Sequence, residues 1–133
     1  MAWRRPARVS RAGAMWTRGD LRSTLHHPEP CMILEVADIR IHPGQQAAFD
    51  EAIQRGLNTV IAHSKGFRGY KVNKGVESPE RYLLMIFWDT LENHTVDFRQ
   101  SEAFAQWRAI VGPFFASPPQ VEHFTLLGKS ASA

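Results

Sequence analysis

Hydrophobic and polar positions alternate along residues 33–41, as they do in a half-buried β-strand. One parity holds Ile33, Ala37, Ile39 and Ile41, and the other holds Leu34, Val36, Asp38 and Arg40. The turn residues at 42–44 end this strand, because Pro43 cannot extend a central strand. The first predicted element is therefore a strand with one apolar face.

The apolar spacing then changes to that of an amphipathic helix. The residues that repeat at helical spacing are Phe49, Ile53, Leu57, Val60 and Ile61. We expect the helix to end near residues 63–66, where Gly66 suits a left-handed C-cap.

Two strands and a second helical region follow. Residues 67–76 and 81–88 are rich in aromatic and branched side chains, and a turn-like segment separates them. Thr90 is a good N-cap, but Asn93 stands where a capping-box acid belongs, so we expect an incomplete box. A further helical piece begins at Ser101 and is interrupted at residues 112–113. Residues 120–127 form the last predicted strand.

The order βαββαβ predicts an α+β, ferredoxin-like fold with a four-stranded antiparallel sheet and both helices on one face. The parity of the strands places a second set of apolar side chains on the opposite face. These are Leu34, Val36, Tyr70, Val72, Leu83, Met85, Phe87, Phe124 and Leu126. Soluble monomers rarely expose such a patch. We therefore expect a homodimer with its two sheets packed face to face.

Length and composition fit one domain, residues 32–128, followed by a flexible tail at 129–133. No apolar run approaches the ~20 residues that span a bilayer, so no membrane segment is predicted. Cys31 is the single cysteine, which excludes an intramolecular disulfide and fits a reducing, cytoplasmic compartment.

The basic charge belongs to residues 1–31. This segment has six arginines and two acidic residues, which leaves the remainder with a net charge of −1. The remainder shows no basic stripe, so nucleic acid is not an expected partner. The segment lacks a sustained apolar period. It fits a disordered arm, sequence translated ahead of a start at Met32, or an Arg-rich transit peptide.

Most of the candidate chemistry lies between Tyr82 and Phe115. The pattern suits a pocket for an aromatic or acidic small molecule. Among these residues, His94 is the candidate acid–base group, placed on an exposed side of its helix. Arg108 lies on an apolar stripe and is the candidate for a ligand anion. The competing interpretation is structural, with the aromatic side chains filling the core. Asp38, His42 and His123 lack a metal-ligand spacing, so no metal site is predicted.

Three segments of the chain resemble the antibiotic biosynthesis monooxygenase family. They are the strand that ends in Phe87-Trp88, the run from Glu92-Asn93-His94 through Phe98-Arg99-Gln100-Ser101 to Phe104 and Trp107, and the segment from Pro119 to Phe124. The resemblance covers about residues 32–127. It implies a dimeric α/β barrel. Some members oxygenate polycyclic aromatic molecules without metal or flavin, some degrade haem, and some isomerise small phosphorylated signalling molecules.

The resemblance also assigns positions. Trp88 matches a Trp of the quinone-forming members, His94 falls at their active-site Tyr, and Leu84 falls at a substrate-activating Asn. The haem-degrading members need an Asn, a Trp and a His. These positions are Ala37, Phe98 and Arg108 here, so none of the three residues is retained. The His of the isomerase-like members falls at Arg99.

These observations favour a cofactor-independent, monooxygenase-like enzyme for an aromatic or enolisable small molecule. In this hypothesis His94 is the base and Arg108 stabilises the anion. The predicted substrate-binding residues are Trp88, Phe98, Trp107, Leu84 and Phe114. A non-catalytic ligand-binding or dimerisation module and an isomerase of the same fold are the alternatives.

Overall fold

The structure, a computed structural model, describes residues 32–131. The hypotheses for residues 1–31, and for the last two residues of the predicted tail, lie outside the described residues. The strands are β1 (Ile33–Arg40), β2 (Phe67–Lys74), β3 (Arg81–Trp88) and β4 (Gln120–Thr125). The α-helices are α2 (Gln46–Thr59) and α3 (Glu102–Val111). Shorter helical turns are η2 (Ile61–His63), η3 (Asn93–Phe98) and η4 (Gly112–Phe114).

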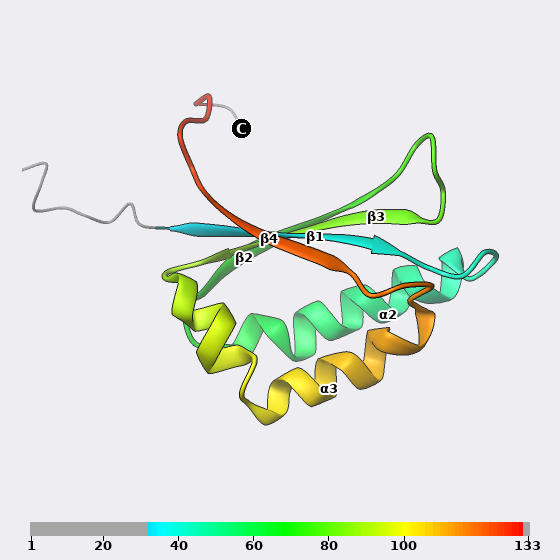
Figure 1. Cartoon of the computed structure of the whole chain (residues 1–133), viewed down its shortest axis with the longest axis horizontal. Coiled ribbons are helices and arrows are strands. Elements are labelled where there is room, and N and C mark those ends of the chain that lie inside the picture. Colours follow the sequence, from blue (N-terminus) through cyan, green and yellow to red (C-terminus); the bar gives the residue numbers. More distant parts are fainter. Residues whose placement is uncertain (1–31, 132–133) are drawn as a thin grey trace, which may run out of the picture. The chain divides into compact units, whose positions relative to one another are not determined.

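The four strands form one antiparallel sheet in the order β2-β3-β1-β4, and α2 and α3 lie side by side on one face of it (Figure 1). This confirms the predicted ferredoxin-like βαββαβ fold. The core lies between the sheet and α2, where Phe49, Ile53 and Leu57 are buried against the alternate residues of β1 and β3. α3 packs beside α2 at Gly56, where an added Cβ would lie 3.0 Å from the Trp107 ring.

The parity predicted for β1, β3 and β4 is correct, but that for β2 is wrong. Tyr70 pairs with Ile86 and Val72 with Leu84, so both face the helices. An irregularity between Phe67 and Gly69 shifts the register of β2 and inverts its faces. The helix-free face of the described sheet therefore carries Leu34, Val36, Leu83, Met85, Phe87 and Phe124 as its apolar side chains.

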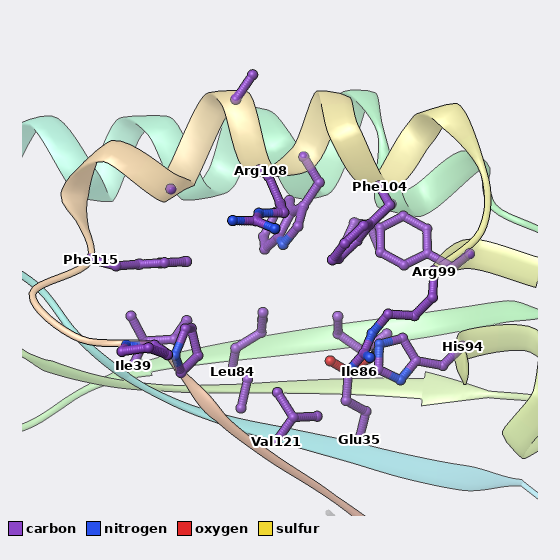
Figure 2. A pocket seen from close by; sticks show the side chains of 18 of the residues that line it. Glu35, Ile39, Leu84, Ile86, His94, Arg99, Phe104, Arg108, Phe115 and Val121 are labelled. Atoms are coloured by element: carbon purple, nitrogen blue, oxygen red, sulfur yellow. Dashed lines mark ion pairs between the residues drawn. The ribbon is translucent and has the colours of Figure 1, made fainter. Parts of the chain in front are cut away.

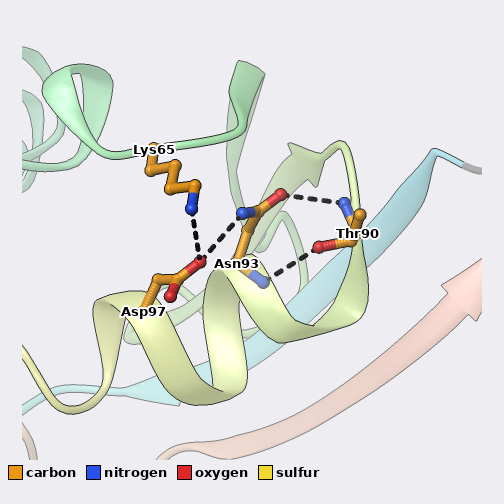
Figure 3. A network of polar contacts seen from close by, with 4 residues as sticks. All are labelled: Lys65, Thr90, Asn93 and Asp97. Carbon is orange, nitrogen blue, oxygen red and sulfur yellow. Dashed lines mark hydrogen bonds and ion pairs between the residues drawn. The ribbon is translucent and has the colours of Figure 1, made fainter.

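A capping box starts η3, contrary to the expectation that Asn93 leaves it incomplete. The Thr90 hydroxyl accepts the backbone N–H of Asn93 at 3.2 Å, and the Asn93 side-chain oxygen accepts the N–H of Thr90 at 3.0 Å (Figure 3). Asn93 also donates to Asp97 at 3.1 Å. The Asn93 amide oxygen thus replaces the carboxylate oxygen of the usual capping-box Glu, and it fixes where this helical turn begins after β3.

Within residues 32–131, no helix is both long and apolar enough to cross a membrane.

Candidate functional site

A cavity of about 890 Å³ lies between the sheet and the layer formed by α3 and η4. Its floor is the helix-facing side of β1, β3 and β4, and its roof is α3, with Phe115 closing one end (Figure 2). The charged and titratable side chains that line it are Glu35, His94, Arg99 and Arg108. The rest of the lining is mostly apolar, so these four groups stand in a partly dry space.

Glu35 is the functional candidate that sequence reasoning missed. It lies on β1 with the same parity as Ala37 and Ile39, so the strand directs it into the core, where it is only 5% exposed. The indole N–H of Trp88 donates to the Glu35 Oε1 at 2.9 Å. The available signal was a single acid on an otherwise apolar strand face.

His94 stands directly against this carboxyl. Its Nε2 lies 3.5 Å from Glu35 Oε1, and its ring stacks on Trp88 with centroids 5.6 Å apart. The expected exposed position is wrong, because His94 is 3% exposed. η3 is a π-helical turn in which the N–H of Arg99 donates to the His94 carbonyl, five residues back. Such turns are uncommon and often occur at functional sites.

The second nitrogen of His94 contacts another histidine. Nδ1 of His94 and Nε2 of His123 are 2.8 Å apart, which is a hydrogen bond whose direction depends on the tautomers. His123 lies on β4 directly opposite Glu35 in the β1–β4 register, so both point to the helix side of the sheet. The sequence pattern predicts no role for His123, because Asp38, His42 and His123 lack a metal-ligand spacing. Its pairing with Glu35 depends on strand register, which the sequence did not show.

The site shifts the pKa values of Glu35, His94 and His123. Burial raises the pKa of the Glu35 carboxyl to about 7, against the opposing effects of the Trp88 hydrogen bond and the Arg99 charge. Burial lowers the pKa of His94 to about 4, and the nearby Arg99 and His123 add to this shift. Burial and Arg99 also lower the pKa of His123. Near neutral pH both imidazoles are therefore uncharged, while Glu35 is close to its midpoint.

Two guanidinium groups face the cavity from the helical side. Arg108 extends from α3 toward the sheet, and Arg99 reaches toward Glu35 and His94 (Figure 2). Each guanidinium carbon lies 5.8 Å from the centre of the Phe104 ring. Within residues 32–131, neither arginine forms a salt bridge with a carboxylate. Both positive charges are therefore available to a bound anion.

Of the seven residues predicted for the site, five line the cavity and two do not. The five are His94, Arg108, Leu84, Phe98 and Trp107. Trp88 is outside the cavity lining and 0% exposed, where its indole donates to Glu35 and its ring stacks on His94. Phe114 turns away and packs against Phe49 with ring centroids 5.5 Å apart, and its neighbour Phe115 lines the cavity instead. Phe115, and not Phe114, continues the helical stripe of Trp107, Arg108 and Val111.

Among the residues that the structure describes, no group of three or more His, Cys, Asp or Glu side chains is arranged to hold a metal ion. The Glu35–His94–His123 cluster has the His94 ring between the other two groups, so the three do not converge on one point.

Comparison with known proteins assigns the chain to a family. The antibiotic biosynthesis monooxygenase profile matches residues 32–110. The uncharacterized protein YczJ of Bacillus subtilis (strain 168) is 34% identical over 93 residues, which is 70% of this chain and 97% of that protein.

Solved structures agree with this assignment. A Bordetella bronchiseptica protein assigned to the same monooxygenase family is 40% identical with a TM-score of 0.69, covering 72% of this chain and 97% of that one. A variant of SnoaB, a cofactor-independent oxygenase from Streptomyces nogalater, shares the fold at 15% identity and a TM-score of 0.65, covering 76% of this chain and 98% of that one. The profile match and the two closer relatives together show that the chain belongs to the antibiotic biosynthesis monooxygenase family.

Proposed function

We propose that the protein is an enzyme that removes a proton from an aromatic, enolisable small molecule and lets the resulting anion react with O₂. The observation that carries this proposal is the pairing of a buried carboxyl, Glu35, with a buried imidazole, His94, at the floor of an open cavity whose roof carries Arg108. Membership of the family, and the description of its fold relative SnoaB as a cofactor-independent oxygenase, support it.

In the proposed complex the planar substrate lies between α3 and the sheet. Leu84, Phe98 and Trp107 provide the apolar contact surface. The Glu35–His94 pair accepts the proton, and a base is most effective when its pKa is near the working pH, as that of Glu35 is. Arg108 faces the oxygen on which negative charge develops, in a site where charge interactions are stronger than in water.

The protein needs to supply no electrons for this reaction. The deprotonated substrate is the reductant and O₂ is the oxidant. A CH₂ group of the substrate and O₂ become a carbonyl group and one molecule of water, so two hydrogens leave the carbon and one oxygen atom joins it. The contribution of the chain is to generate and stabilise the anion and to limit the access of water.

An isomerase is the second candidate, because the same acid–base pair could move a proton between two carbons of a substrate without O₂. The non-catalytic module is less well supported, since that hypothesis has side chains filling the pocket, whereas the cavity is open. Oxygen consumption separates the two enzymes: an oxygenase consumes one O₂ per product molecule, and an isomerase consumes none.

The test is to incubate the full-length protein with an anthrone and, separately, with a naphthol. Oxygen uptake and the incorporation of label from ¹⁸O₂ are then measured. We expect one labelled oxygen atom per product molecule and a loss of most of the activity in Arg108→Gln. His42→Ala is the matched control, because His42 is exposed and outside the cavity. Proton exchange without oxygen uptake would favour the isomerase, and binding without either reaction would contradict both enzymes.

We also propose that the protein works as a homodimer that covers the helix-free face of the sheet. That face carries the six apolar side chains named above, and Phe124 is 46% exposed in the single chain. Burying such a face against a second copy would supply the area of a typical specific interface, about 800 Å² per partner.

A further inference from the structure

The three titratable groups Glu35, His94 and His123 form a continuous line from the cavity to the edge of the sheet. They come from β1, η3 and β4. The gaps between them are 3.5 Å, from Glu35 Oε1 to His94 Nε2, and 2.8 Å, from His94 Nδ1 to His123 Nε2. Figure 2 shows the first two groups beside each other at the floor of the cavity.

The two inner groups of this line are buried, and the outer one is more exposed. Glu35 is 5% exposed and His94 is 3% exposed, whereas His123 is only partly buried. His123 lies on β4, which is an edge strand of the described sheet. His94 therefore has one nitrogen directed at a group that lines the cavity and the other at a group near the outer edge.

Building on the proposed function, we propose that Glu35, His94 and His123 form a proton relay, in which Glu35 takes the proton released in the cavity and the two histidines conduct it to the edge of β4. The relay deepens the acid–base role proposed above, because it assigns a direction of proton flow and adds His123 to the residues that turnover requires.

The relay moves one proton outward through a chain of transfers. Before transfer Glu35 is protonated at Oε1, His94 carries its hydrogen on Nδ1, and His123 carries its hydrogen on Nδ1. The Glu35 proton moves to His94 Nε2 while the hydrogen on His94 Nδ1 moves to His123 Nε2. The hydrogen on His123 Nδ1 then leaves to water. One proton has left the protein, and both histidines are neutral at the start and at the end.

The surrounding charges favour this concerted exchange over a stored imidazolium. The charged groups that face the relay are Arg99, which follows η3, and Arg108 of α3. The positive charge of Arg99 and burial together lower the pKa of both histidines. An added proton on either imidazole would create a positive charge that these surroundings disfavour. Changing tautomers moves the proton outward without creating that charge.

The direct test is ¹⁵N NMR of the imidazole rings in the full-length protein without any substrate. As the pH rises through the pKa of Glu35, about 7, we expect the hydrogen to shift from Nδ1 to Nε2 in both His94 and His123. In Glu35→Gln both tautomers should become independent of pH in this range. A His123 ring whose tautomer is the same on both sides of the transition would overturn the relay.

A kinetic test uses His123→Ala with the substrate that the oxygen-uptake assay identifies. We expect turnover to fall by at least about 10-fold, and added imidazole to restore part of it by entering the space of the missing ring. His42→Ala should keep full activity and show no response to imidazole. An unchanged turnover in His123→Ala, or a loss that imidazole cannot restore, would count against the relay.

The two proposals fail separately. The NMR measurement requires no reaction, so inactivity toward every substrate contradicts the proposed function and leaves the coupled tautomers as they are. A fixed His123 tautomer in an active enzyme contradicts the relay alone.

Discussion

Glu35 and His94 share one proton, and burial reverses the order in which a free carboxyl and a free imidazole would bind it. In the folded protein between about pH 4 and pH 7, Glu35 holds the proton and His94 is neutral, because burial disfavours both charged forms. In the unfolded chain over most of this range, the carboxyl is ionised and the imidazole is protonated. The pair carries the same number of protons in both states, so its two contributions to pH dependence largely cancel.

Removing one partner should reveal the contribution of the other. A raised carboxyl pKa means that the folded state binds more protons than the unfolded state between pH 4.5 and about 7, so the Glu35 contribution to stability falls as the pH rises. A lowered imidazole pKa has the opposite sign, so the His94 contribution rises from about pH 4 to pH 6.5.

We therefore predict that Glu35→Gln gains stability relative to wild type as the pH rises from 4.5 to about 7. His94→Phe should lose stability relative to wild type as the pH rises from about 4 to 6.5. Each change is of the order of 3 kcal/mol at most, from about 1.4 kcal/mol per pKa unit. Urea denaturation of both variants at several pH values measures it, and slopes of equal sign would contradict the description of the pair.

The proposed function assigns His94 a part in proton transfer, which substitution can test. His94→Gln keeps a polar side chain of similar size but cannot exchange protons near neutral pH, so turnover should fall by roughly 100-fold. His94→Ala should fall as far and also lose about 2 kcal/mol of stability, because the vacated space adjoins Trp88. Turnover and urea denaturation of both variants check this. A His94→Gln variant with wild-type turnover would remove His94 from the reaction.

At the scale of elements, the short turn η3 positions the site, and its starting cap is specific. Asn93 is 6% exposed and satisfies the N–H of Thr90. Gly66 lies against it, since an added Cβ at Gly66 would come within 2.0 Å of the Asn93 oxygen. The left-handed φ of +83° at Gly66 would itself strain any other residue. The turn after α2 and the start of η3 therefore pack directly against each other at Gly66 and Asn93.

We predict that Asn93→Ala lowers the free energy of unfolding by about 1–2 kcal/mol, the usual cost of a lost cap. Thr90→Val should cost a similar amount, because it removes the hydroxyl that accepts the Asn93 N–H. Thr90→Ser, which keeps that hydroxyl, is the matched control and should stay within about 0.5 kcal/mol of wild type. Urea denaturation measures all three. An equal loss in Thr90→Val and Thr90→Ser would show that the hydroxyl does not matter.

At the scale of the whole molecule, the proposed dimer depends on the helix-free face of the sheet. Phe87 lies on this face near the end of β3, an inner strand of the sheet, where it pairs with Leu34 on β1 and Gly69 on β2. Phe87→Asp should split the proposed dimer, because a charge would then be buried at the interface. Val76→Asp is the control, since Val76 is 88% exposed in the turn after β2. Sedimentation at micromolar concentration checks both, and a wild-type monomer would contradict the dimer.

Local patterns in the sequence determined the elements and the fold. Alternation placed Ala37 and Ile39 on the covered face of β1, the helical repeat placed Phe49 and Leu57 against it, and Gly66 ended that helical region. These signals are short in range, because side-chain periodicity and turn chemistry act within a few residues. The resemblance to the family rested on the same contiguous segments.

Only the tertiary structure decided the composition of the site. Glu35, His94 and His123 are far apart in the chain, and they meet through the β1–β4 register and the path of η3. The shifted pKa values of Glu35, His94 and His123 follow mainly from burial, which exists only after the fold has formed. The sequence could therefore identify His94 and Arg108 as candidates, but not the carboxyl and the second imidazole that complete the cluster.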